Sequence, residues 1–146
     1  YIIMANVFID SNLWVYAFIE TQRNEEETKR NKIILLLEEV NKKDNITISV
    51  QVINEFHWTV KTKYDVGEGE IRNKVINGIL KVAKVTPVDL SIYKSAFQIR
   101  DNYNISYWDS LIITSALENG CNILYSEDMQ HNQLIENRLR IINLFK

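Results

Sequence analysis

Cysteine, proline and glycine are all scarce in this chain. Its 146 residues include one cysteine, one proline and four glycines. A single cysteine, Cys121, excludes an internal disulfide and fits a reducing compartment, so we expect a cytoplasmic protein. Little glycine and proline, with 46% hydrophobic residues, excludes a collagen-like or disordered chain. The length suits one domain over residues 1–146.

Long apolar runs and an excess of one charge are also absent. No stretch approaches the ~20 apolar residues of a membrane span, and residues 1–9 lack the basic side chains of a secretory signal. We therefore expect no membrane association. Seventeen basic against nineteen acidic residues give a net charge of −2, which argues against a protein that wraps DNA by bulk positive charge. Two divalent cations held by four carboxylates would turn that balance positive.

Short apolar segments alternate with segments of helical periodicity. Strands are expected at residues 6–9, 46–48, 82–86, 122–126 and 139–144. Helices are expected at residues 13–19, 29–43, 50–64, 70–81, 91–103 and 106–119. Residues 21–28 fit a loop or a charged helix start, and the pair at 44–45 is expected to break the second helix. This alternation predicts one α/β domain whose parallel sheet is covered on both faces.

Four acidic residues are expected near the carboxyl ends of strands, where ligands bind to parallel sheets. Asp10 ends the first strand, and Asp128 lies two residues beyond the strand at 122–126. Glu55 is on the helix that follows the second strand, and Asp109 is near the start of the helix at 106–119. Four like charges brought together repel strongly unless a cation lies among them. Their joint placement therefore predicts a cation site.

Each acid also has a purely structural interpretation. Asp10 could cap the helix after it, and Asp109 stands three residues after Ser106, the spacing of a capping box. Glu55 could be a solvated helix residue, and Asp128 an acceptor in a polar turn. Oxygen ligands without histidine or cysteine favour Mg²⁺ or Mn²⁺ over Zn²⁺. The metal hypothesis therefore depends on the four acids meeting in space.

Other reactive or aromatic side chains fit structural roles better. Three tryptophans could stack unpaired bases of a nucleic acid, but each fits a core position better: Trp14, Trp58 and Trp108. His57 and His131 are expected as ordinary surface or core histidines rather than as a general base. Cys121 is expected as a small buried hydrophobe.

Four segments resemble, in order and spacing, the signature segments of PIN-domain proteins. They are residues Phe8–Asn12, Asn54–Phe56, Tyr107–Ile112 and Leu124–Met129. The resemblance covers essentially the whole chain and is greatest to the VapC-type toxins of bacterial and archaeal toxin–antitoxin pairs. It implies a three-layer α/β/α sandwich with a mostly parallel central sheet. It also implies an endoribonuclease site that holds Mg²⁺ or Mn²⁺.

The resemblance also implies roles for individual residues. The family's acidic quartet is matched by Asp10, Glu55, Asp109 and Asp128, which would be both metal-binding and catalytic. Asn12 and Ser126 match polar residues that support the quartet. Two features depart from the pattern: Ser110 stands where the family more often has alanine, a change expected to be harmless, and Glu127 leaves open which acid of its turn faces the metal.

Activity and partners follow from the same resemblance. It implies metal-assisted hydrolysis of RNA to a 5′-phosphate and a 3′-hydroxyl, a small antitoxin protein as partner, and a homodimer. The early helices supply apolar side chains beyond the needs of one core face, suited to either interface: Trp14, Phe18, Ile34 and Leu35. Two alternatives stay open, a non-catalytic RNA-binding PIN-like module and a receiver-type phosphoacceptor domain. The receiver pattern needs an adjacent acidic pair, whereas Ser11 and Asn12 follow Asp10.

Overall fold

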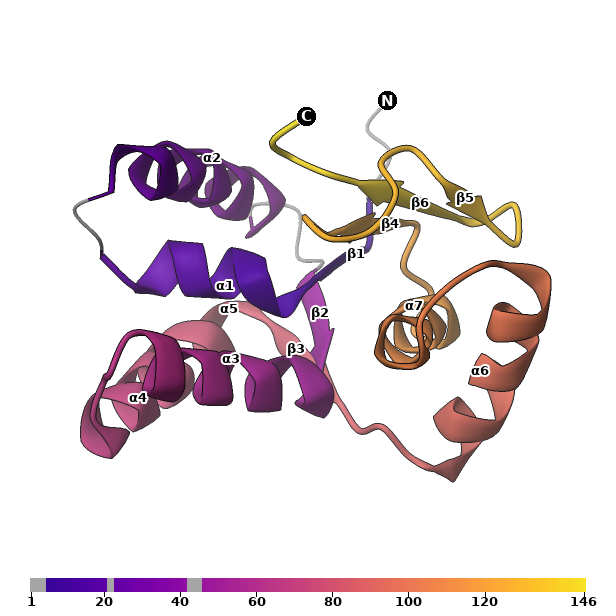
Figure 1. Ribbon diagram of the computed structural model, residues 1–146, viewed down its shortest axis with the longest axis horizontal. Coiled ribbons are helices and arrows are strands. Elements are labelled where there is room, and N and C mark those ends of the chain that lie inside the picture. Colours follow the sequence, from indigo (N-terminus) through magenta and orange to yellow (C-terminus); the bar gives the residue numbers. More distant parts are fainter. Residues whose placement is uncertain (1–4, 21–22, 42–45) are drawn as a thin grey trace.

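A single mixed sheet forms the centre of the molecule in the computed structural model, which describes residues 5–20, 23–41 and 46–146 (Figure 1). Its strands are β1 (Val7–Ile9), β2 (Ile46–Ser49), β3 (Lys84–Thr86), β4 (Ile123–Tyr125), β5 (Leu134–Ile135) and β6 (Leu139–Ile142). Their order across the sheet is β3-β2-β1-β4-β6-β5. Neighbouring strands are parallel except the edge pair β5–β6. The expectation of a mostly parallel sheet is therefore confirmed.

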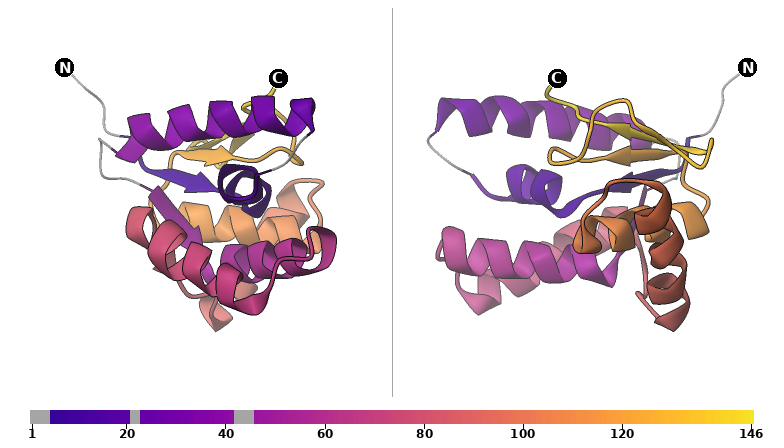
Figure 2. Two further views of the ribbon diagram at one scale, coloured as in Figure 1. Left: turned by 90° about the vertical axis from the view of Figure 1, so that its left-hand side faces the viewer. Right: turned by 45° about the vertical axis from the view of Figure 1, so that its right-hand side comes forward.

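Helices cover both faces of this sheet. They are α1 (Ser11–Phe18), α2 (Asn24–Asn41), α3 (Val50–Lys63), α4 (Glu68–Lys74), the π-helical turn η1 (Val75–Ile79), α5 (Leu80–Val82), α6 (Leu90–Asn102) and α7 (Tyr107–Glu118). Figure 2 shows α2 and α7 on opposite sides of the strands, with α6 packed outside α7. The three-layer α/β/α arrangement is thus confirmed. No helix within the described ranges is long and apolar enough to cross a membrane.

The strand order reverses beside Asp10. From β1 the chain builds the sheet outward through β2 and β3, and then returns to place β4 on the other side of β1. Ligands bind at such a reversal point, outside the carboxyl ends of the two strands. Asp10 directly follows β1 and Ser126 directly follows β4, and the Asp10 N–H donates to the Tyr125 carbonyl at 3.0 Å. The site residues are thus tied to the centre of the sheet.

The core explains why these strands read as uninterrupted apolar runs. Every residue of β1 is buried, as expected for a central parallel strand with helices on both faces. Residues 110–117 of α7 are all buried too, because this helix lies between the sheet and α6. Deep burial on both sides fixes α7 firmly, and with it the acid in its first turn.

Three elements differ from the sequence-based expectations. The expected helix at 70–81 consists of α4, η1 and α5, and the wider π-helical turn contains Gly78, which lies against the Phe18 ring. The helix expected from residue 29 already begins at Asn24, while residues 21–22 and the expected break at 44–45 lie outside the described part. The short strand β5 was not expected.

Candidate active site

Asp10 is buried at this reversal point and serves two purposes. It is the N-cap of α1, and its Oδ1 accepts the Ser11 N–H at 2.8 Å. Its Oδ2 accepts the Ser126 hydroxyl at 3.0 Å. Only 6% of the residue is exposed, and this burial raises the pKa of its carboxyl to about 7 despite both hydrogen bonds. The capping role and a place in the acidic site are therefore compatible.

Glu55 approaches Asp10 from α3, near enough for the two charges to repel. This helix starts directly after β2, so its second turn stands above the carboxyl end of the sheet. Glu55 is half-buried, and Gln51, one turn earlier, donates from Nε2 to Glu55 Oε2 at 3.4 Å. Burial raises the pKa of Glu55, which the hydrogen bonds from Gln51 and Ser11 oppose.

Asp109 and Asp128 complete the group from the other side. Ser106 caps α7, with its hydroxyl accepting the Asp109 N–H at 3.3 Å, which is half of the expected capping box. Burial raises the pKa of Asp109. Asp128 is exposed, and its Oδ2 accepts the side-chain amide of Asn12 at 2.5 Å. Both acids line a hollow of about 150 Å³ together with the amides of Gln130 and Gln133.

Repulsion among these carboxylates links them into one group, here called the acidic site (Asp10, Glu55, Asp109 and Asp128). The pKa of Asp10 is raised by the charges of Glu55 and Asp109. The pKa of Glu55 is raised by Asp109 and Asp128, and that of Asp109 by Asp128. Within the described ranges, no lysine or arginine forms an ion pair with any of the four. The site therefore has a surplus of negative charge.

Glu127, the neighbour of Asp128, points elsewhere. Its carboxylate accepts Lys29 Nζ at 2.5 Å and the Tyr16 hydroxyl at 2.7 Å. Lys29 and Glu127 are both mostly shielded from solvent, and Lys29 also lies over the rings of Tyr16 and Phe145. These contacts hold Glu127 against α1 and α2, so Asp128 is the acid of this turn that the acidic site contains.

The donor set fits a hard divalent cation. In the part of the chain that the structure describes, no three histidine, cysteine or acidic side chains stand close enough to form a ready metal cage. Mg²⁺ does not require one, because it keeps several waters and takes only one or two carboxylates. The surplus negative charge of the acidic site, its all-oxygen donors and its open side toward solvent at Asp128 suit such an ion.

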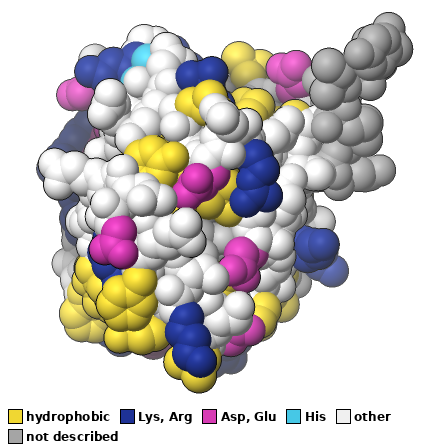
Figure 3. Space-filling model, turned by 90° about the vertical axis from the view of Figure 1, so that its right-hand side faces the viewer, with side chains coloured by type: hydrophobic (Ala, Val, Ile, Leu, Met, Phe, Trp, Pro, Cys, Tyr) yellow, Lys and Arg dark blue, Asp and Glu magenta, His cyan; other side chains and the backbone are white. Residues whose placement is uncertain are grey.

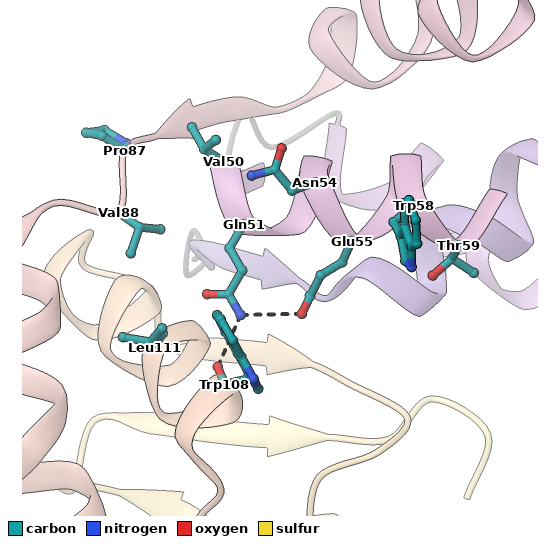
Figure 4. A pocket seen from close by; sticks show the side chains of 10 residues that line it. All are labelled: Val50, Gln51, Asn54, Glu55, Trp58, Thr59, Pro87, Val88, Trp108 and Leu111. Atoms are coloured by element: carbon teal, nitrogen blue, oxygen red, sulfur yellow. Dashed lines mark hydrogen bonds between the residues drawn. The ribbon is translucent and has the colours of Figure 1, made fainter. Parts of the chain in front are cut away.

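A groove of about 740 Å³ adjoins Glu55 and corrects one expectation. Trp14 is buried in the core as expected, but Trp58 and Trp108 are 67% and 62% exposed and line this groove (Figure 4). For those two residues the core expectation is wrong. Gln51, which sequence reasoning missed, lies on the groove wall and also donates to the Trp108 carbonyl at 3.2 Å. Its spacing of four residues before Glu55 on one helix was the available signal.

The remaining candidates have structural partners. His57 Nε2 lies 3.0 Å from Glu68 Oε2, and His131 Nδ1 accepts the Asn143 N–H at 2.9 Å. Cys121 is buried, and burial raises the pKa of its thiol to about 11, so it is not a thiolate at neutral pH. Ser110 donates to the Tyr107 carbonyl and accepts from Arg100, both at 2.6 Å. Its buried hydroxyl therefore has partners on both sides.

Charges of both signs alternate on the face that α6 and the β5–β6 hairpin border. Figure 3 shows acidic, basic and hydrophobic side chains interspersed there, with no continuous basic patch. This agrees with the net charge of −2 and with the absence of bulk positive charge inferred from the sequence.

Comparison with known proteins agrees with this architecture. The fold is similar to VapC20 of Mycobacterium tuberculosis, a toxin that cleaves the sarcin–ricin loop, with 15% identity, a TM-score of 0.61, and coverage of 82% of this chain and 87% of that one. It is similar to a chain of a toxin–antitoxin complex from Klebsiella pneumoniae, with 16% identity, a TM-score of 0.66, and coverage of 95% and 98%. It is also similar to a chain of DNA-bound VapBC from Salmonella typhimurium, with 18% identity, a TM-score of 0.61, and coverage of 97% and 99%.

Family membership follows from the sequence itself. Among curated proteins, no sequence matches this chain significantly. The family description of the PIN domain, however, matches residues 7–136, from the first residue of β1 to just beyond β5. These residues include all four members of the acidic site. The chain therefore belongs to the PIN domain family.

Proposed function

We propose that this chain is a Mg²⁺- or Mn²⁺-dependent endoribonuclease that acts as the toxin of a toxin–antitoxin pair in the cytoplasm. The observation that carries the proposal is the acidic site, four carboxylates from four separate segments whose mutual repulsion raises the pKa of Asp10, Glu55 and Asp109. Within the described ranges, no lysine or arginine forms an ion pair with any of the four. Structural acids are normally paired or solvated. A surplus of carboxylates at the reversal point of the sheet is suited to holding cations and the phosphate that binds to them.

Each residue has a defined task in this proposal. Asp10, Glu55, Asp109 and Asp128 would hold the metal, which when bound supplies a water of lowered pKa and neutralises charge on the phosphate. Ser11 and Ser126 fix both oxygens of Asp10. Gln51 and Asn12 orient Glu55 and Asp128 in the same way. Hydrolysis breaks the bond between phosphorus and the 3′ oxygen, and leaves a 5′-phosphate and a 3′-hydroxyl.

The partners follow from the same likeness. Two of the similar structures are toxin–antitoxin complexes, so we propose that a small antitoxin protein binds this chain and covers the acidic site. We also propose that the chain forms a homodimer. Of the four apolar side chains singled out for interfaces, Leu35 is 66% exposed on α2, whereas Trp14 is fully buried and contributes to the core instead.

One experiment tests the activity directly. Purified protein is incubated with transfer RNA and messenger RNA fragments in EDTA, and then with Mg²⁺ or Mn²⁺ restored. Cleavage that requires the metal, with 5′-phosphate ends on the new fragments, is the expected result. Asp109→Asn serves as the inactive control. Retention of RNA without any metal-dependent cut would favour the non-catalytic RNA-binding alternative, while family membership leaves the receiver-domain alternative without support.

A second experiment tests the biological role. Induced expression of the chain in a bacterial host should arrest growth, and Asp109→Asn should not. Co-expression of the short open reading frame next to its gene should restore growth and yield a complex that co-purifies with the chain. Growth that continues under strong expression of soluble, active enzyme would contradict the toxin role without contradicting the nuclease activity.

A further inference from the structure

The groove beside the acidic site has a wall made by one face of α3. Gln51, Glu55 and Trp58 are spaced four and three residues apart, so their side chains project from the same side of the helix. Figure 4 shows Gln51 and Glu55 pointing toward Trp108, with Trp58 further along α3. Trp108 comes from the first turn of α7 and immediately precedes Asp109. One groove thus brings together two exposed indole rings and one carboxylate of the acidic site, with a second carboxylate next in sequence.

Gln51 has an acceptor without a partner in this groove. The residue is 91% buried, since only 9% of its surface is exposed, and its Oε1 makes no hydrogen bond to any part of the chain that the structure describes. The orientation of the amide is fixed, because both neighbours of Nε2, the Glu55 carboxylate and the Trp108 carbonyl, can only accept. Oε1 therefore points the other way, toward Val88 and Leu111 on the opposite wall (Figure 4).

These features define the chemistry of a suitable occupant. The exposed lining is largely apolar and includes two indoles, which favours a flat aromatic group that can stack. A buried acceptor without a partner costs about 1–3 kcal/mol, which a ligand N–H can recover. Among the residues that the structure describes, no lysine or arginine lines the groove, so it is unsuited to a phosphate. A volume near 740 Å³ lies in the usual range of small-ligand sites, roughly 300–1,000 Å³.

We propose that this groove, lined by Gln51, Trp58 and Trp108, binds one unpaired nucleobase of the RNA strand beside the phosphate that is cleaved. The inference rests on the proposed function, since it places the base next to the acidic site. Every RNA base carries an N–H or amino donor on its edge and a flat face, so the groove selects for an unstacked base and hence for single-stranded RNA. A base that is paired in a duplex has neither its edge nor both faces free.

The test compares RNA with and without bases. An Asp128→Asn background in Mg²⁺ prevents cleavage, and Asp128 does not line the groove. The probes are a fluorescein-labelled single-stranded RNA ten nucleotides long and the same ribose-phosphate backbone without bases. Fluorescence anisotropy gives both dissociation constants. The dissociation constant of the base-free backbone divided by that of the RNA measures the contribution of the bases. Trp58→Ala and Trp108→Ala should each lower this ratio roughly tenfold.

Conservative and distant variants make the result decisive. Trp58→Phe and Trp108→Phe keep a stacking face and should preserve most of the ratio, and Phe97→Ala, an exposed aromatic on α6 outside the groove, should leave it unchanged. An unchanged ratio in both alanine variants would overturn the proposal. If the alanine variants instead changed the oligomeric state on gel filtration and left the ratio intact, the groove would be a protein interface, and the proposal would also be overturned. Because binding is measured without cleavage, a failure here is distinct from a failure of the nuclease proposal.

Discussion

The Ser126 hydroxyl donates to Asp10 Oδ2 at 3.0 Å and joins the carboxyl ends of β4 and β1, the two strands between which the sheet reverses its order. The Ser11 N–H binds the other oxygen of the same carboxylate. Asp10 is thereby fixed in one orientation inside a buried site, where ionisation is costly. Its pKa of about 7 means that the carboxyl is partly protonated at neutral pH when no cation is bound.

Asp10→Asn should therefore stabilise the metal-free protein at alkaline pH. The pKa of Asp10 is raised on folding, from 3.8 to about 7, so its stabilising effect is complete at low pH and is lost as pH rises through about 7. The cost of holding the charge at pH 8 is on the order of 4 kcal/mol. Urea unfolding in EDTA should show the free energy of unfolding of the variant rising relative to wild type between about pH 4 and pH 7, with the difference kept at pH 8.

Metal provides the matching control. At pH 8, adding Mg²⁺ should stabilise wild type, because an ion that binds only the folded state adds to its stability. Asp10→Asn should gain much less, and it should not cleave RNA. If the free energy of unfolding changed with pH in the same way for both proteins in EDTA, Asp10 would keep its ordinary pKa and would be more exposed to solvent than the structure indicates.

Asp109→Asn and Glu127→Gln should have opposite effects on activity and stability. Asp109→Asn removes a carboxylate of the acidic site and should lower the rate of RNA cleavage by at least about a hundredfold. The free energy of unfolding should stay the same or rise slightly, because repulsion among the carboxylates is relieved. Glu127→Gln should leave cleavage within a few-fold of wild type. It should lower the free energy of unfolding by about 1–3 kcal/mol, because the charged bond to Lys29 is lost.

The measurement pairs initial cleavage rates with urea unfolding for both proteins. Since Glu127 and Asp128 are adjacent, this pair also decides which acid of the turn matters. Strong loss of cleavage in a stable Glu127→Gln protein would show that Glu127, released from Lys29, serves the metal.

Much of the fold could be predicted because burial on both faces leaves a clear sequence pattern. The central strands β1 and β4 lie where short apolar runs end in polar residues, and α7 begins at a serine that caps it. Strand β6 was expected, but β5, and with it the β5–β6 hairpin, was missed for a physical reason. Its turn places Glu136 and Asn137 at positive φ, a geometry usually signalled by glycine, which this turn lacks.

The acidic site could be predicted only as residue types near strand ends. Sequence spacing placed Asp10, Glu55, Asp109 and Asp128 near one edge of the sheet, but it could not orient them. It could not separate Asp128 from Glu127 either, because that depends on Lys29, which is distant in sequence. The groove was missed for a similar reason. Its walls come from α3 and α7, so the exposure of Trp58 and Trp108 depends on how two helices pack.

Gly78→Ala should destabilise the protein, whereas Gly69→Ala should not. A Cβ on Gly78 would collide with Cε1 of Phe18 and lie 3.0 Å from its Cζ, in the π-helical turn η1. Overpacking of this kind costs about 1–3 kcal/mol. Gly69 lies in α4 with nothing near its Cβ position, so alanine there should stabilise by about 0.5–1 kcal/mol. Thermal unfolding of both variants tests this, and equal effects would show that η1 tolerates a side chain.

Asn12→Ala should weaken metal binding at the acidic site without disrupting the fold. The side-chain amide of Asn12, on the first turn of α1, donates to Asp128 Oδ2 at 2.5 Å. Within the described ranges, Asn12 forms no hydrogen bond to another residue of the acidic site. Loss of a group that orients a metal-binding carboxylate typically costs 10–100-fold in metal affinity or activity. Titration of Mg²⁺ against cleavage rate should therefore show a half-maximal concentration raised about tenfold or more. Asn31→Ala, exposed on α2, is the matched control and should titrate like wild type. If both variants need the same Mg²⁺ concentration as wild type, Asp128 binds the metal without help from α1, or does not bind it.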